Sequence, residues 1–105
     1  MGNGPREREV VWTTAARDCV DEILAYIVEQ SPAGAAKVLE AIGATAGSLV
    51  ELSERGTVVK ELADQSIREV YVYRYRMIYQ VGSEQVRILA VIHGAMDFAG
   101  RLKDP

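Results

Sequence analysis

The 105-residue sequence has one cysteine, one histidine, and no basic excess. Cys19 has no second thiol for an internal disulfide, and a single thiolate does not make a metal site. A lone cysteine is typical of a reducing compartment, so we expect a cytoplasmic protein. No run of about 18 apolar residues occurs, and the polar amino terminus has no apolar signal segment, so we expect neither a membrane span nor a secretory signal.

The charge balance is acidic, with 12 Lys and Arg against 15 Asp and Glu and a formal net charge of −3. Proteins that grip nucleic-acid phosphates usually carry a basic excess, because each neutralised phosphate releases counterions. The acidity is uneven. Residues 1–66 carry six basic and eleven acidic residues, net −5, whereas residues 67–105 carry six and four, net +2. This leaves room for a local basic surface near the predicted strands, formed by Arg68, Arg74, Arg76 and Arg87.

The length and the apolar content of 49% fit one globular domain. We divide the chain into a flexible leader at 1–8, a single domain at 9–98 and a tail at 99–105. The β-branched and aromatic run at 10–13 predicts a strand. From Ala15 the apolar spacing is helical, and Thr13 or Thr14 can cap this helix. Ser31-Pro32 ends it and starts a second helix from about Pro32 to Leu52.

Gly43 and Gly47 lie one turn apart in the second predicted helix, where each costs about 1 kcal/mol relative to alanine. We expect these small residues to let the first helix or the sheet approach closely.

After an irregular connection at 56–66 the apolar period changes to two. The alternation predicts three strands, at about 67–73, 75–81 and 86–93, with a turn at Arg74 and a hairpin loop at 82–84. The order β-α-α-β-β-β predicts an α+β domain in which a helical hairpin packs on one face of a small, mostly antiparallel sheet. The first strand, near Val11, is expected to add at an edge of that sheet.

Several segments in this order resemble the RelE/ParE toxin superfamily of bacterial type II toxin–antitoxin pairs. They are AARDCVDEILAYIVEQSPAGA in the helical hairpin, KEL before the sheet, IREVYVYRYRMIYQV in the first two strands of the meander, and VIHGAMDF at its end. The resemblance covers about 10–98. Its most specific part is Tyr75-Arg76-x-x-Tyr79-Gln80-Val81 followed by a strand that ends in His93-Gly94.

The superfamily implies two alternative activities. RelE-type members are ribosome-dependent mRNA endonucleases, whereas ParE-type members inhibit DNA gyrase without cleaving RNA. RNA cleavage by the 2′-hydroxyl needs a base, an acid and cations that stabilise the phosphorane. By the resemblance, a nuclease of this sequence would use Arg68, Arg76 and His93.

Three positions depart from the RelE-type pattern. Val70 stands where a second lysine would fall, Met96 where an arginine is common, and Phe98 where RelE-type enzymes have a late tyrosine. Together with the acidic balance, these departures favour the ParE-type branch and a protein that is not an enzyme. A non-toxic family member that only binds its antitoxin is a further alternative.

His93 has two interpretations. Its ordinary pKa suits proton transfer at neutral pH, so it is a candidate general acid or base. Alternatively, it hydrogen-bonds a neighbouring backbone group where the last strand leaves the sheet.

The clustered tyrosines also have two interpretations. Cross-strand aromatic pairs stabilise sheets by about 0.2–1 kcal/mol each, whereas tyrosine and arginine are enriched at binding hot spots. The resemblance implies a cognate antitoxin, ParD-like or similar, in a hetero-oligomer. We expect it on the sheet and the outer groove of the helical hairpin. The candidate partner-binding residues are Tyr71, Tyr73, Arg74, Tyr75, Arg76 and Tyr79. The implied target is DNA gyrase, ahead of the ribosome and mRNA, and the sequence suggests no metal or other cofactor.

Overall fold

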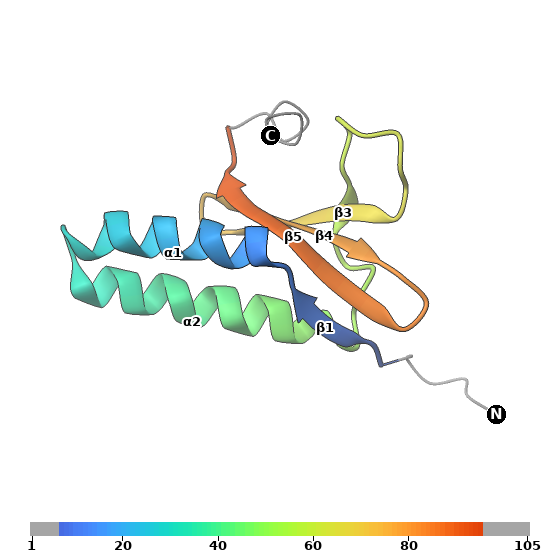
Figure 1. Ribbon diagram of the computed structural model, residues 1–105, viewed down its shortest axis with the longest axis horizontal. Helices are drawn as coiled ribbons and strands as arrows, with labels where there is room; N and C mark the ends of the chain where they lie inside the picture. Colours follow the sequence, from blue (N-terminus) through green and yellow to red (C-terminus); the bar gives the residue numbers. More distant parts are fainter. Residues whose placement is uncertain (1–6, 96–105) are drawn as a thin grey trace.

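Two helices lie along one face of a twisted five-stranded sheet in the computed structural model, which describes residues 7–95 (Figure 1). The elements follow one another as β1 (Glu9–Trp12), α1 (Thr14–Val28), α2 (Pro32–Ser48), β2 (Thr57–Val58), β3 (Ile67–Val72), β4 (Tyr75–Val81) and β5 (Gln85–His93). The predicted α+β order is confirmed, with one short strand added. Most of the predicted leader, the tail at 99–105, Met96 and Phe98 lie outside the described residues. Within the described part of the chain, none of the helices has the length and apolar character needed to cross a bilayer.

The strand order across the sheet is β1-β5-β4-β3-β2. β3, β4 and β5 form the predicted antiparallel meander, and β1 pairs with β5 in parallel at the edge. β2 occupies part of the segment expected to be irregular, where Thr57 and Val58 pair with Glu69 and Arg68. A two-residue strand carries no alternation that a sequence pattern could reveal.

Both helices begin at hydroxyl caps. The Thr13 hydroxyl accepts from the Ala16 amide at 3.1 Å and donates to the Ile88 carbonyl at 2.7 Å, so the same group starts α1 and ties it to β5. Ser31 accepts from the Gly34 amide at 2.9 Å, and Pro32 occupies the first turn of α2, as expected.

α2 ends at Ser48, so the predicted end at Leu52 is wrong. The amides of Leu49 and Val50 bond three residues back, to Ala46 and Gly47, which tightens the final turn. Leu49 is fully buried, and the Ser53 hydroxyl donates to its carbonyl at 2.7 Å. The chain therefore turns into the core where the apolar pattern alone would continue the helix.

The expectation for Gly43 and Gly47 is also wrong. Both are exposed, and a Cβ added at either would meet no atom within 4 Å. The inward side of α2 is formed instead by Ala35, Ile42 and Ala46. Neither the first helix nor the sheet approaches the two glycines.

Buried side chains cover both sides of the sheet, and the largest fully buried ones are Tyr79, Ile42, Leu49, Met77, Ile78, Ile88, Val59, Val86 and Val91. Neighbouring residues along β4 alternate between two faces, yet 76–79 are all buried. We call the side of the sheet that packs on the helices the helix face, and the opposite side the far face.

Candidate functional site

Arg76 lies on the far face of β4 and is only 4% exposed. Its Nε donates to Glu69 of the neighbouring strand at 2.5 Å. Its two terminal nitrogens donate to the two carboxylate oxygens of Glu61, at 2.9 and 3.1 Å. This two-pronged geometry matches the planar guanidinium to a carboxylate. Arg76 thus ties the segment between β2 and β3 to the centre of the sheet.

The two carboxylates of this cluster keep Arg76 in its charged form and balance its positive charge. Burial alone would lower the pKa of Arg76. Hydrogen bonds from the guanidinium to Glu61 and Glu69, and their negative charge, outweigh burial and raise that pKa above its ordinary value. The cation that sequence comparison places in a nuclease site is therefore matched by two carboxylates of the same chain. Neither Glu61 nor Glu69 was expected from the sequence, because Glu61 lies in the segment without a regular pattern.

Arg68 and Tyr79 hold the loop at 54–56. The Arg68 Nη1 donates to the carbonyl of Gly56 at 2.7 Å and to that of Glu54 at 3.3 Å. The hydroxyl of the buried Tyr79 accepts from the Gly56 amide at 2.9 Å. Burial raises the pKa of Tyr79, against the lowering effect of this hydrogen bond. Both side chains are engaged by backbone groups of one loop.

The three candidate nuclease residues do not meet at one point. Arg68 is paired with Tyr79 and His93 with Tyr75, whereas Arg76 is paired with Tyr71. Because side chains alternate along β4, these pairings place Arg76 on the far face and the other two on the helix face. Arg68 lies at the level of Ile88 on β5. His93 is five residues further along that strand, roughly 16 Å away at the usual rise.

His93 is exposed at the end of β5. Its Nδ1 accepts from the Ala95 amide at 3.2 Å, and its ring stands edge-on to Tyr75 with the centroids 6.3 Å apart. The backbone hydrogen bond matches the structural interpretation of this residue.

The predicted partner-binding residues divide into an exposed and a buried group. Tyr71 and Tyr73 are 58% and 66% exposed, Arg74 is exposed between Tyr73 and Tyr75, and Tyr75 is half-buried. Arg76 and Tyr79 lie beneath the surface at 4% and 0%. The exposed group surrounds the β3–β4 turn, where Tyr73 adopts a left-handed φ of 53°.

A groove of about 510 Å³ runs between this turn and the end of the helical hairpin. We call it the aromatic groove; its side-chain walls include Tyr26, Lys37, Tyr73, Arg74 and Tyr75. An adjoining hollow shares Tyr26 and Tyr75 and reaches His93. Tyr26, 68% exposed, was missed by the sequence analysis. It falls outside the apolar stripe of α1, and that position is the signal that could have indicated a surface role.

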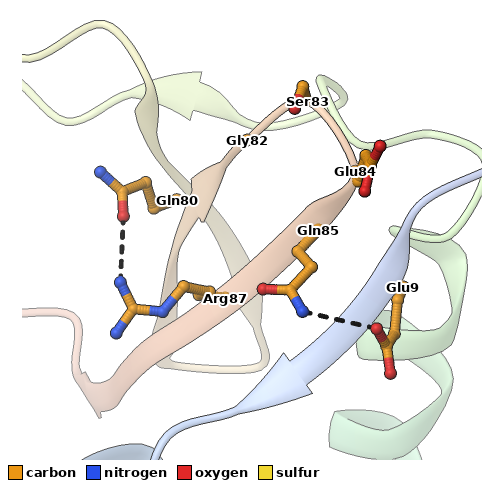
Figure 2. Close-up of a pocket in the computed structure, with 7 residues that line it drawn as sticks. All are labelled: Glu9, Gln80, Gly82, Ser83, Glu84, Gln85 and Arg87. Carbon is orange, nitrogen blue, oxygen red and sulfur yellow. Dashed lines mark hydrogen bonds between the residues drawn. The ribbon is translucent and has the colours of Figure 1, made fainter.

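A second, polar hollow of about 400 Å³ lies at the β4–β5 hairpin (Figure 2). Gln85 points toward Glu9 and Arg87 toward Gln80, and each pair is joined by a hydrogen bond of 3.4 Å. None of the predicted site residues lines this hollow. Within 7–95, no three His, Cys, Asp or Glu side chains are grouped so as to hold a metal ion.

Comparison with known proteins agrees with this fold. Residues 10–98 match the family model described as the ParE toxin of the type II toxin–antitoxin system parDE. No curated protein sequence matches the chain as a relative.

Two solved structures share the fold. The chromosomal ParDE toxin–antitoxin system from P. aeruginosa superposes with a TM-score of 0.67 at 19% identity, over 83% of this chain and 96% of the matched chain. The toxin–antitoxin complex RelBE2 from Mycobacterium tuberculosis gives 0.58 at 24% identity, over 87% and 95%. Since the family model spans most of the sequence, this chain belongs to the ParE family of toxins in the RelE/ParE superfamily.

Proposed function

We propose that this toxin is neutralised by a cognate antitoxin and, when released, inhibits DNA gyrase without a catalytic step of its own. The observation that carries the proposal is the state of Arg76, whose guanidinium is held by Glu61 and Glu69. An arginine that stabilises a phosphorane must direct its donors at the substrate. Here those donors are directed at two carboxylates.

The separation of the other candidates supports the same proposal. Arg68 donates to backbone carbonyls of the 54–56 loop. His93 lies on the opposite face of the sheet from Arg76. General acid–base catalysis requires its groups within hydrogen-bonding reach of one substrate. A protein that acts by binding has no such requirement.

The antitoxin contact is proposed at the exposed aromatic residues around the β3–β4 turn. The two structural neighbours are toxin–antitoxin complexes, which supports an antitoxin partner for this chain. Tyr71, Tyr73 and Tyr75 offer large apolar surfaces, and Arg74 offers a charge-assisted donor; residues of these types dominate binding energies at interfaces. A ParD-like antitoxin with an acidic and apolar tail would complement this surface.

A DNA supercoiling assay tests the gyrase target. Purified toxin in molar excess over gyrase is expected to inhibit supercoiling, and the toxin–antitoxin complex, as the matched control, is expected to have no effect. Unchanged supercoiling at toxin excess would contradict the proposed target, provided that the same toxin arrests growth when it is expressed in cells.

Primer extension on translated mRNA tests the RelE-type alternative. The proposal predicts no codon-linked cuts when the toxin is added to a translation reaction. Cuts that disappear in His93→Gln, a substitution at an exposed position, would establish a nuclease and overturn the non-catalytic mechanism.

A further inference from the structure

The aromatic groove lies where the helical hairpin and the sheet meet at one end of the molecule. The connected ends of α1 and α2 extend beyond the sheet (Figure 1). On the α2 side the groove is lined by Gly34, Lys37 and Val38, whose spacing of three and four residues places them on one side of that helix. On the sheet side it is lined by Tyr73 and Arg74 of the β3–β4 turn. A ligand in this groove would therefore contact both layers of the fold.

The two charged side chains that line this groove are both cations. Lys37 and Arg74 are exposed. Within the described part of the chain, neither the ammonium nor the guanidinium group has a hydrogen-bond or ion-pair partner. The polar hollow at the β4–β5 hairpin differs, because its Arg87 shares the walls with Glu9 and Glu84. The aromatic groove thus holds positive charge with which no described carboxylate pairs.

This positive charge is a local feature of an acidic protein. The chain has a net charge of −3, and the part that contains Lys37, residues 1–66, has six basic and eleven acidic residues. Two cations that face one hollow repel each other, and the low-dielectric walls concentrate their potential there. Both side chains are exposed, so packing gives no reason for a cation at either position. An anionic ligand would remove the repulsion.

The other walls of the groove are aromatic and aliphatic. Tyr26 and Tyr73 are 68% and 66% exposed, and Tyr75 is half-buried. Ile27 and Val38 are half-buried beside them. Surface of this kind binds apolar side chains, and tyrosine and arginine are the residues that most often carry binding energy. The groove therefore fits a ligand that combines anionic and apolar groups.

An acidic peptide and a strand of nucleic acid both have such groups, and the adjoining hollow favours the peptide. This hollow shares Tyr26 and Tyr75 with the groove and is also lined by Glu22. A nucleic acid carries a negative charge at every nucleotide, so a strand that followed the surface out of the groove would meet this carboxylate. A peptide can place its carboxylates at the cations and a neutral or basic residue over the hollow.

We propose that the aromatic groove binds an acidic and apolar segment of the antitoxin, whose carboxylates pair with Lys37 and Arg74. Apolar side chains of the segment cover Tyr26 and Tyr73, and a neutral or basic part of it lies over the hollow that contains Glu22. The charge pattern of the two hollows thus sets the direction of the bound segment and repels segments of a different pattern. This inference rests on the proposed neutralisation by an antitoxin and assigns the residues that select the partner.

Charge reversal with matched controls tests the cation pair. Titration calorimetry of the full chain with the cognate antitoxin at low ionic strength is expected to show binding about tenfold weaker or more for Lys37→Glu and for Arg74→Glu. Lys60→Glu and Arg87→Glu make the same changes of net charge at exposed positions outside the groove. These two controls should stay within about twofold of the wild type. Circular dichroism checks that all four variants are folded.

Compensating changes in the antitoxin test the pairing itself. Each acidic residue of the antitoxin is replaced in turn by lysine, and one such variant should bind Lys37→Glu about tenfold better than the unchanged antitoxin does. Glu22→Lys tests the direction, because a neutral or basic segment over the hollow gains nothing from it. Tighter binding of the antitoxin to Glu22→Lys would overturn the proposed direction.

Two results separate this inference from the proposed function. An antitoxin that binds the wild type, Lys37→Glu and Arg74→Glu equally would overturn the inference and leave the antitoxin partner in place. An antitoxin that does not bind the wild type would overturn both. A single-stranded DNA oligonucleotide that displaces the antitoxin from the wild type but binds Lys37→Glu more weakly would assign the groove to nucleic acid instead.

Discussion

Arg76 illustrates how one side chain can change its role without changing its position in a sequence motif. In the motif it follows Tyr75 on a strand, where an exposed arginine would serve as a phosphate-binding cation. In the folded chain its donors are directed to Glu69 across the strand pair and to Glu61 from the preceding segment. The partner that matters is fifteen residues away in a segment with no repeating pattern. Sequence alone could identify the arginine but not what it binds.

Removing Arg76 should therefore affect stability before it affects any activity. Arg76→Ala leaves Glu69 without its cation in a largely buried position, and we expect the free energy of unfolding to fall by about 3 kcal/mol. Urea denaturation measures this change. Arg87→Ala, which truncates an exposed arginine on the next strand, is the control and should stay within about 0.5 kcal/mol of the wild type. Equal effects of the two substitutions would show that the buried ion pairs contribute nothing.

Tyr79 should make the fold sensitive to alkali. Burial raises its pKa above the ordinary 10.0, so the folded state holds this proton more tightly than the unfolded state. The resulting stability is fully present below pH 10 and is lost as the pH rises through the folded pKa. Tyr79→Phe should remove this part of the alkaline loss. At pH 7 it should cost about 1–3 kcal/mol, because the buried Gly56 amide loses its acceptor.

Urea denaturation at steps between pH 7 and 11 separates the two effects. Tyr73→Phe is the control, since the hydroxyl it removes belongs to an exposed side chain. It should retain the alkaline loss of the wild type. A Tyr79→Phe protein with the same alkaline loss would assign that loss to other groups.

At the scale of elements, the sequence predicts best where one local rule decides the structure. The hydroxyl caps, the proline that starts α2 and the two-residue period of β4 and β5 are each determined within a few neighbouring residues. The end of α2 and the strand β2 depend on tertiary contacts instead. Leu49 leaves the helix because its side chain packs in the core. Thr57 and Val58 form a strand because they pair with β3.

The Thr13 hydroxyl joins α1 to β5, so removing it should cost more stability than removing an ordinary surface hydroxyl. Thr13→Ala removes the acceptor for the Ala16 amide and the donor to the Ile88 carbonyl. We expect a loss of about 1–2 kcal/mol in the free energy of unfolding. Thr14→Ala changes the neighbouring, exposed threonine and should have little effect. A larger loss of stability for Thr14→Ala than for Thr13→Ala would show that Thr13 is not the residue that caps α1.

Two glycines at different element boundaries should respond to the same substitution with opposite signs. Gly47→Ala adds a methyl group in open space near the end of α2 and should stabilise the protein by roughly 0.5–1 kcal/mol. Gly56→Ala places a Cβ against the Glu69 carbonyl and 2.6 Å from the Tyr79 hydroxyl, and should destabilise it by about 1–3 kcal/mol. Thermal denaturation of both variants beside the wild type measures the difference, and changes of the same sign would contradict this assignment.

At the scale of the whole molecule, the arginines of the described strands, between residues 67 and 95, do not gather into one basic face. Of the four arginines on or beside the strands, Arg76 is buried and Arg68 is bound to the 54–56 loop, which leaves Arg74 and Arg87 exposed. The net charge of a segment could be counted from its sequence, but how much of it reaches solvent depended on the fold. The same reasoning separates the predicted tyrosines, since exposure at Tyr71 and Tyr73 and burial at Tyr79 follow from their places in the sheet.

Tyr73 offers a way to separate binding from folding across the whole molecule. Its left-handed φ of 53° disfavours residues with a Cβ by about 1–2 kcal/mol, whereas glycine adopts it freely. Tyr73→Gly should therefore raise the free energy of unfolding by about 1 kcal/mol while it weakens antitoxin binding about tenfold or more. Tyr73→Ala removes the same ring but keeps the backbone strain, so it should weaken binding equally without the gain in stability. Titration calorimetry with the cognate antitoxin and urea denaturation measure the two quantities. If both variants bind the antitoxin as the wild type does, the antitoxin does not contact this side of the β3–β4 turn, and the aromatic groove serves another partner.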